Sequence, residues 1–339
     1  MGNHYLCSMK SKREEQRMLW WQRYHYGEEA KRSMKRRNAH HDYYSRRIYM
    51  ITLAVEGRKP VLGNLCEPDE DHREPWVRPS ILGERILNNW TTIPSHYPEV
   101  RNLAIQLMPD HLHFILFVTK QVPYHLGKVV NGFKTGCNKI SRELLGSTLW
   151  EDGYHDRILQ KEGQLEAMMH YMHDNPRRLW IKRKNPDYFT VQREINVNNT
   201  TVAMAGNRFL LHYPIKAVVQ CSRSINNEET IAREVKRYMS MVRDGAVLVS
   251  ASISPCEKAV MRAGFEAGAK EIILLENGFS PMWKPGGAQF DACAKGQLLF
   301  VAPWSYHSDH KTITREQCMQ LNGLAREIAE LSPQSGDSM

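Results

Sequence analysis

The chain has 339 residues, of which 42% are apolar and 24% charged, and 46 Lys and Arg against 37 Asp and Glu give a formal net charge of +9. This composition excludes a disordered chain, a collagen-like chain and a disulfide scaffold, and the length suffices for two domains. No apolar run reaches the ~18 residues that a membrane helix needs, and the N-terminus lacks the apolar core of a secretory signal, so no membrane partner is expected.

The positive charge is concentrated in the first part of the chain. Residues 1–206 hold 31 Lys and Arg against 23 Asp and Glu, whereas residues 207–339 hold 15 against 14. The excess predicts a polyanion, most simply a nucleic acid, bound by the first part. The seven cysteines are odd in number, scattered and without a CxxC pair, which is typical of reduced thiols in a cytoplasmic protein and argues against a cysteine zinc site.

A basic N-terminal arm is predicted over residues 1–43, where Lys and Arg are interspersed with Trp and Tyr. Two interpretations of it stay open. It is either a solvated, partly helical tail or an arm that neutralises phosphates and stacks on bases.

Residues 44–185 form the next predicted domain. Strand patterns, rich in β-branched and aromatic residues, occupy 47–55, 100–108 and 111–118. Helical periodicity occupies 81–90, 126–145 and the segment from 163 onward. The acidic, Pro-rich residues 66–79 are predicted as a loop, and Pro176 is expected to end or kink the last helix.

The pattern changes at residue 186. Residues 186–213 are predicted as connecting strands or a linker, with strand patterns over 188–197 and 201–211. Over 214–332, strand patterns at 215–220, 246–250, 271–275 and 297–302 alternate with helical patterns at 228–242, 256–267 and 315–331. This alternation indicates a doubly wound, mostly parallel sheet, and residues 333–339 are a tail.

The segment Pro109-Asp110-His111-Leu112-His113 carries two alternating histidines in a strand pattern. Residues i and i+2 of a strand point to the same face, so the two imidazoles would lie side by side. Such a pair can bind a divalent metal but lacks a third ligand. Alone it is more often a pair of surface or hydrogen-bonded histidines than a metal site.

The segment Tyr171-Met172-His173-Asp174-Asn175-Pro176 places a phenol and an amide four residues apart. On a helix, Tyr171 and Asn175 share one face. Asn175 could complete a metal site with the histidines, and the bound metal would hold a phosphodiester oxygen as a Lewis acid. Tyr171 would attack the phosphorus as a covalent nucleophile. Alone, Tyr171 is more simply a core residue and Asn175-Pro176 a helix terminator.

These motifs resemble the HUH single-tyrosine transposases, in particular the REP-associated tyrosine transposases. The resemblance rests on four elements that occur in the family's order: Arg47–Val55, Met108–His113, Trp150–Leu159 and Tyr171–Arg177. It covers about residues 44–180 and implies a ferredoxin-like α+β catalytic domain with an antiparallel sheet. It also implies a metal-dependent endonuclease and strand transferase that acts on single-stranded or hairpin DNA, and a homodimer.

The roles of individual residues follow from this resemblance. His111, His113 and Asn175 would hold Mg²⁺ or Mn²⁺, and Tyr171 would form a 5′-phosphotyrosine. Tyr154 is a competing tyrosine in the neighbouring Gly153-Tyr-His-Asp-Arg157 segment.

Five cations are candidate DNA contacts in the same domain. Lys128, Lys134 and Lys139 lie on the polar faces of the helix predicted over 126–145, while Arg177 and Arg178 follow the tyrosine. The two arginines could equally be a cation pair near a helix C-terminus.

Residues 214–305 resemble the Rossmann-like domain of DNA-processing proteins, within the wider group of lysine-decarboxylase-like nucleotide hydrolases. The glycine-rich turn of that group appears here as Ser250-Ala-Ser-Ile-Ser254, without glycine, which disfavours phosphate binding. Two alternatives to the transposase-like enzyme stay open for the whole chain. One is a non-catalytic DNA-binding regulator derived from a transposase, and the other is a nucleotide-processing enzyme that uses the second domain.

Overall fold

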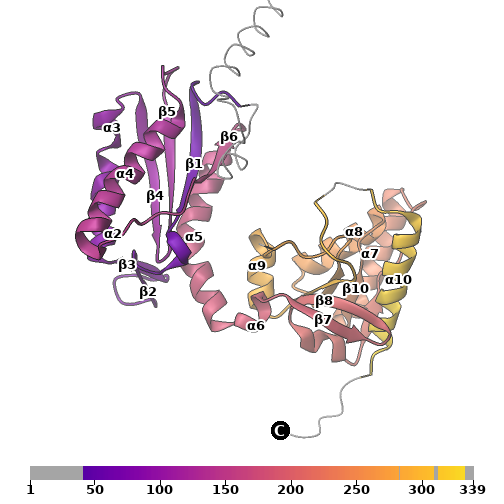
Figure 1. Ribbon diagram of the computed structural model, residues 1–339. Coiled ribbons are helices and arrows are strands. Elements are labelled where there is room, and N and C mark those ends of the chain that lie inside the picture. The colour runs from indigo at the N-terminus through magenta and orange to yellow at the C-terminus, as the bar shows by residue number, and fades with distance from the viewer. Residues whose placement is uncertain (1–40, 282, 309–311, 333–339) are drawn as a thin grey trace, which may run out of the picture. The chain divides into compact units, whose positions relative to one another are not determined.

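The computed structural model describes residues 41–281, 283–308 and 312–332. The chain divides after Trp180 into two compact units, coloured from indigo to rose and from rose to yellow in Figure 1. Most of the basic N-terminal arm and the whole predicted tail lie outside the described residues. Within the described residues, no helix is both long and apolar enough to cross a membrane.

The first unit is built on a four-stranded antiparallel sheet with the strand order β4-β5-β1-β6. Its strands are β1 (Arg47–Ala54), β4 (Val100–Met108), β5 (His111–Val118) and β6 (His155–Leu159). Its helices are α2 (Ile81–Thr91), α3 (Ile93–His96), α4 (Leu126–Leu145) and α5 (Gln164–Lys184), and a short 3-10 turn, η2 (Glu56–Arg58), follows β1. The antiparallel sheet and its position in the chain agree with the sequence analysis.

The two faces of this sheet are covered by different helices. On one face, Ile51 of β1 and Phe114 of β5 lie in a core that includes Val129 and Phe133 of α4 and Ile86 of α2. The other face is covered by α5, whose buried Met172 belongs to a second cluster with Met50, Ile115 and Leu159. Because strand side chains alternate between faces, His111 and His113 share the α5 face with Ile115, while Leu112 belongs to the core on the α4 side.

Helix α5 continues past Pro176 to Lys184, so of the two outcomes expected at this proline, an end or a kink, the end does not occur. Proline removes one backbone hydrogen bond inside a helix and costs about 3 kcal/mol. Tertiary burial offsets that cost here, because Pro176 and Met172 are both buried. The consequence for function is that Tyr171 and Asn175 lie on one uninterrupted helix.

A two-stranded hairpin corrects the loop predicted over residues 66–79. Strand β2 (Gly63–Cys66) pairs with β3 (Trp76–Pro79), and only the residues between them form a loop. The hairpin is joined to the histidine segment through the backbone, because the Leu62 amide donates to the Pro109 carbonyl at 3.0 Å. The acidic, Pro-rich composition of this segment gave no local strand signal, and β3 is held in place by its pairing with β2.

The second unit has a six-stranded sheet with the order β7-β8-β12-β11-β10-β9. Strands β9 (Lys216–Val218), β10 (Val247–Ser250), β11 (Glu271–Leu274) and β12 (Leu298–Ala302) are parallel. Helices α7 (Glu228–Arg243), α8 (Pro255–Glu266), α9 (Gly287–Ala294) and α10 (Arg315–Glu330) connect and flank them. The mostly parallel sheet agrees with the prediction, whereas α9 was not expected.

The segment 186–213 belongs to the sheet of the second unit. It contains the short helix α6 (Pro186–Phe189), strands β7 (Gln192–Val197) and β8 (Thr200–Gly206), and the 3-10 helix η3 (Arg208–His212). Strand β8 pairs antiparallel with β12, so the predicted connecting strands extend the sheet. Strand β7 begins several residues later than predicted, and β8 ends several residues earlier. Alternate residues such as Val249 and Leu248 pack against α10 on one face and against α7 and α8 on the other.

Candidate functional site

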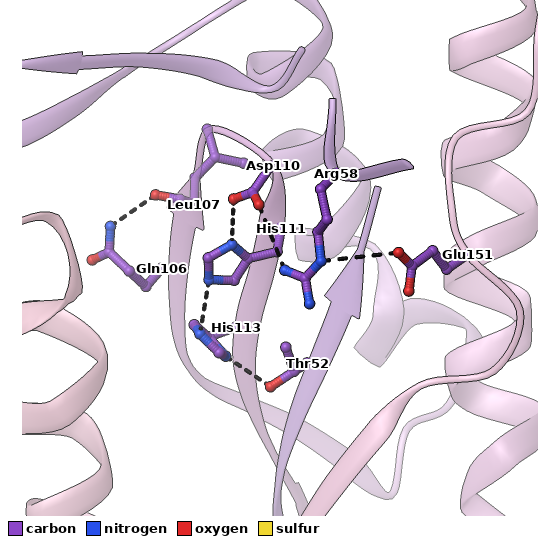
Figure 2. Close-up of polar contacts among 8 residues, drawn as sticks. All are labelled: Thr52, Arg58, Gln106, Leu107, Asp110, His111, His113 and Glu151. Carbon is purple, nitrogen blue, oxygen red and sulfur yellow. Dashed lines mark hydrogen bonds and ion pairs between the residues drawn. The ribbon is translucent and has the colours of Figure 1, made fainter. Parts of the chain in front are cut away.

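The two histidines of β5 meet at the end of the sheet. Their Nε2 atoms are 3.1 Å apart, and their rings make an edge contact with centroids 4.7 Å apart. His113 is 7% exposed, and His111 is half-buried. The sequence prediction that both imidazoles share one face is confirmed, and the two Nε2 atoms face each other (Figure 2).

The opposite nitrogen of each ring is held by a polar side chain. His111 Nδ1 lies 2.6 Å from Asp110 Oδ1, and His113 Nδ1 lies 2.8 Å from Thr52 Oγ1. A carboxylate only accepts hydrogen bonds, so His111 donates its Nδ1–H to Asp110, and as a neutral ring in this tautomer it would offer a lone pair on Nε2. A Thr52 hydroxyl that accepts from Nδ1 gives His113 the same tautomer. Histidine ligands of metals are oriented in this way in general.

A chain of polar contacts extends from the histidines to the neighbouring loops (Figure 2). Arg58 Nη1 lies 3.6 Å from Asp110 Oδ2, and Arg58 Nε lies 3.9 Å from Glu151 Oε1. Arg58 is in the left-handed region with φ of 53°, within the 3-10 turn that follows β1. Burial opposes ionisation of Asp110, but the hydrogen bond and charge of His111 and the charge of Arg58 outweigh it, so the pKa of Asp110 lies below its ordinary value.

The spacing of the histidines fits a divalent ion. Two ligands about 2.1 Å from an octahedral ion and at right angles to each other lie about 3.0 Å apart, close to the observed Nε2 separation of 3.1 Å. Within the described part of the chain, no group of three or more His, Cys, Asp or Glu side chains could hold a metal ion.

Tyr171 lies on the same side of the sheet as the histidine pair. Its ring centroid is 6.2 Å from that of His113, at an interplanar angle of 66°, and its side chain is half-buried. Tyr154, the competing tyrosine, is 3% exposed and belongs to the core on the α4 face. Of these two tyrosines, only Tyr171 is beside the histidines.

Asn175 lies one turn beyond Tyr171 on α5 and is half-buried. Its Nδ2 is a buried atom with no hydrogen-bond partner among the described residues. The oxygen and nitrogen of an amide have nearly the same shape, so a rotated amide would place an oxygen at this orphaned position. The histidines and Asn175 make no hydrogen bond to each other among the described residues, and their convergence on one ion stays a prediction.

Arg177 and Arg178 are both paired with Asp174. Arg177 donates from Nε and Nη2 to the two carboxylate oxygens at 2.5 and 3.2 Å, and Arg178 Nη1 lies 3.7 Å from Asp174 Oδ2. The Arg178 side chain is only 9% exposed. The two arginines are therefore positioned by an acid, and a DNA phosphate would have to share them with Asp174.

The three lysines of α4 lie on the sheet face opposite the histidines. Lys134 donates to the backbone carbonyls of Glu151 and Gly153 at 2.8 and 2.9 Å, which fixes the loop before β6. Lys128 is exposed with its ammonium 5.9 Å from the Tyr124 ring centroid, and Lys139 is exposed. These lysines are on the helix that covers the other face of the sheet from the histidine pair, and Lys134 has a structural contact that the sequence did not predict.

Thr52, Arg58 and Glu151 were not identified from the sequence. Thr52 reaches His113 because the two are cross-strand partners. Thr52 is also opposite His155 of β6, and His113 is also opposite Gln106 of β4. A polar residue within the apolar run 47–55 was the available signal. Its partner depends on strand register, which no local pattern contains.

The second unit carries a buried carboxylate, Glu257, at one edge of its sheet. Glu257 accepts the backbone N–H groups of Cys221, Ile253 and Ser254 at 3.0, 2.6 and 3.2 Å, and it is 2% exposed. These amides lie at the carboxyl ends of β9 and β10, the edge where open α/β sheets bind ligands. The chain's own acid occupies these donors, which disfavours a nucleotide phosphate here.

No protein-family model matches the chain. Over 177 residues it is 24% identical to an uncharacterized protein of Haemophilus influenzae, which covers 45% of this chain and 92% of that protein.

Solved structures with some similarity include a REP-associated tyrosine transposase bound to a REP hairpin (11% identity, 41% of this chain, 72% of that chain, TM-score 0.32). A second is a protein of Deinococcus radiodurans assigned as a transposase (17% identity, 41% of this chain, 96% of that chain, TM-score 0.26). A third is DNA processing protein A of Helicobacter pylori, described for its single-stranded DNA binding (14% identity, 42% of this chain, 67% of that chain, TM-score 0.31).

Proposed function

We propose that the first unit is a metal-dependent, single-strand-specific DNA endonuclease and strand transferase of the HUH single-tyrosine type. One observation carries the proposal: the two Nε2 atoms lie 3.1 Å apart and the Tyr171 ring is beside His113. The succession β1-α2-β4-β5-α4-β6 with the strand order β4-β5-β1-β6 supports it, because this is the split βαβ arrangement of ferredoxin-like domains.

In this proposal His111, His113 and Asn175 hold Mg²⁺ or Mn²⁺. When bound, the ion polarises a non-bridging phosphate oxygen and orients the phosphodiester. Asp110 and Thr52 keep both Nε2 lone pairs directed at one position. The half-buried Asn175 amide adds a neutral oxygen ligand, a type that these hard cations accept.

Tyr171 performs the covalent step. Its Oη forms a bond to phosphorus while the bond from phosphorus to the 3′-oxygen breaks, and the DNA is left attached as a 5′-phosphotyrosine. The phenol releases its proton to solvent, and the departing 3′-oxygen takes one up, so no oxidant or other reactant is needed. A 3′-hydroxyl from another strand can then attack the phosphotyrosine, which restores a phosphodiester and the free phenol.

An adduct assay tests this function. The full chain is mixed with Mn²⁺ and labelled single-stranded or hairpin oligonucleotides from the DNA that flanks its own gene, and covalent products are resolved under denaturing conditions. We expect an adduct with the wild type and with Tyr154→Phe, and none with Tyr171→Phe or after chelation. Peptide mapping of the adduct to residue 171 completes the test.

The arrangement of the site in one chain gives a second readout. Tyr171 and His113 of the same chain lie side by side, so mixing Tyr171→Phe with His111→Ala should not restore adduct formation in a dimer. Salt-sensitive hairpin binding without any adduct would instead establish the non-catalytic regulator.

A further inference from the structure

A cavity of about 620 Å³ lies in the second unit, and every residue that lines it falls between Lys184 and His212. This volume is within the range of about 300 to 1,000 Å³ typical of small-molecule sites. Gly206, at the end of β8, is part of its wall and pairs with Leu299 at the start of β12. The cavity is therefore at the amino ends of the parallel strands, away from the edge occupied by Glu257.

The cavity combines an apolar interior with an exposed aromatic ring. Ile195, Met204 and Leu211 line it and belong to or pack against the hydrophobic core of the unit. Phe209 also lines it, yet its side chain is 75% exposed. A large exposed ring beside an apolar hollow is a surface on which a flat aromatic group can stack.

Charged and polar groups surround this apolar surface. Lys184 and Arg208 are cationic, His212 adds an imidazole, and Asp187 is the one acidic residue in the lining. Arg208 donates from Nη1 to Gln192 on β7, and both Arg208 and Phe209 belong to the lining. His212 Nδ1 is buried and has no hydrogen-bond partner among the described residues, so a polar group of a ligand could satisfy it.

Hydrogen bonds and a ring stack within the chain hold the walls of the cavity in place without a ligand. The side chain of Asn207 accepts the Phe209 amide at 3.1 Å and donates to the Gly296 carbonyl at 2.8 Å, which fixes η3. Helix α6 is fixed by the stack of Phe189 on Phe290, with ring centroids 4.7 Å apart. A ligand therefore meets a formed site and does not have to order a loop, which lowers the cost of binding.

We propose that this cavity binds a nucleotide, with the base stacked on Phe209 over the apolar surface and the phosphate held by Arg208 and Lys184. A nucleotide joins a flat aromatic group to an anion, as the lining requires. The inference does not rest on the activity proposed for the first unit. A free nucleotide and one nucleotide of a single strand have the same chemistry, and the experiment separates these two sources.

Photo-crosslinking locates such a site directly in the full chain. The probes are 5-iodo-2′-deoxyuridine 5′-monophosphate and a short oligothymidylate that carries one 5-iodo-2′-deoxyuridine, and crosslinked peptides are identified by mass spectrometry. We expect crosslinks within residues 184–212. Crosslinking by the monophosphate indicates a free nucleotide, and crosslinking by the oligonucleotide alone indicates a strand.

Matched variants test the lining. Phe209→Ala should weaken the binding of the successful probe between about five-fold and about a hundred-fold, the range for loss of one base stack, and Arg208→Ala should weaken it as well. Met319→Ala removes an apolar side chain on α10 that is 65% exposed, and Arg233→Ala removes an exposed arginine on α7. Absence of crosslinks from 184–212, or equal losses in the control variants, would overturn the proposal. Crosslinks confined to residues before 180 leave the first unit's function intact but refute this site.

Discussion

Thr52 on β1 and His113 on β5 are directly opposite each other in the antiparallel ladder, and the threonine Oγ1 lies 2.8 Å from the histidine Nδ1. This contact fixes the ring orientation and leaves Nε2 facing His111. The pair of histidines is therefore organised from two elements, by a strand neighbour for His113 and by the preceding Asp110 for His111. Both supports lead to predictions.

Thr52→Val removes the hydroxyl and keeps the shape of the side chain. Loss of an orienting partner typically lowers metal affinity about 10- to 100-fold, and we expect a loss of this size for Mn²⁺, measured by isothermal titration calorimetry. Thr52→Ser, which keeps the hydroxyl, should recover most of the affinity. Unchanged Mn²⁺ binding by Thr52→Val would show that the hydroxyl does not orient His113.

Asp110→Asn keeps the size of the side chain and removes its negative charge. In the wild type, this carboxylate accepts a hydrogen bond from His111 Nδ1 and faces Arg58. We expect a similar loss of about 10- to 100-fold in Mn²⁺ affinity and a slower adduct reaction. Asp152→Asn is the control, because Asp152 is an exposed acid in the same part of the chain. Equal losses in the two variants would assign the effect to general charge and not to the His111 contact.

Lys134→Met should lower stability. The substitution leaves the carbonyls of Glu151 and Gly153 without their donor, and we expect the free energy of unfolding of the first unit to fall by about 1 to 3 kcal/mol. Lys139→Met, on the exposed side of the same helix, should change it by less than about 0.5 kcal/mol. Urea unfolding measures both. A loss of DNA affinity by Lys134→Met without a loss of stability would restore the DNA-binding role.

Glu271 should make the second unit less stable at alkaline pH. Burial raises the pKa of its carboxyl to about 8 from an ordinary value of 4.5, and its Oε1 has no hydrogen-bond partner among the described residues. The folded state therefore retains a proton that the unfolded state has released. The stabilisation is complete below about pH 4.5 and is lost as the pH rises through about 8.

The loss expected for Glu271 is on the order of 4 kcal/mol. Urea unfolding of the second unit at about pH 5 and about pH 9 measures it, and Glu271→Gln should reduce the difference between the two conditions. Parallel curves for the wild type and the variant would show that Glu271 does not titrate in this range.

Much of the first unit could be predicted because its signals are local. The helix predicted over 126–145 coincides with α4, and the strand predicted over 111–118 coincides with β5. Apolar spacing and β-branched composition reflect the side on which each residue is buried. The same alternation placed His111 and His113 on one face, and helical spacing placed Tyr171 and Asn175 on one helix.

Other features depend on contacts between distant segments. The strand at Trp76–Pro79 exists because Gly63–Cys66 pairs with it, and α5 continues through Pro176 because its surroundings are packed. In both cases tertiary contacts outweigh a local preference. The contacts of Lys134, Arg177 and Arg178 likewise follow from where acids and carbonyls lie in three dimensions.

The sequence by itself determined the chemistry available to this protein: two alternating histidines, a tyrosine with an amide one helical turn away, and a basic first part. Only the tertiary structure decided how these groups are combined. It placed α5 on the histidine face, Tyr154 in the core and the α4 lysines on the opposite face. The physical reason is that residue spacing fixes the face of an element, whereas strand register and helix packing, which depend on the burial of the whole chain, fix which faces meet.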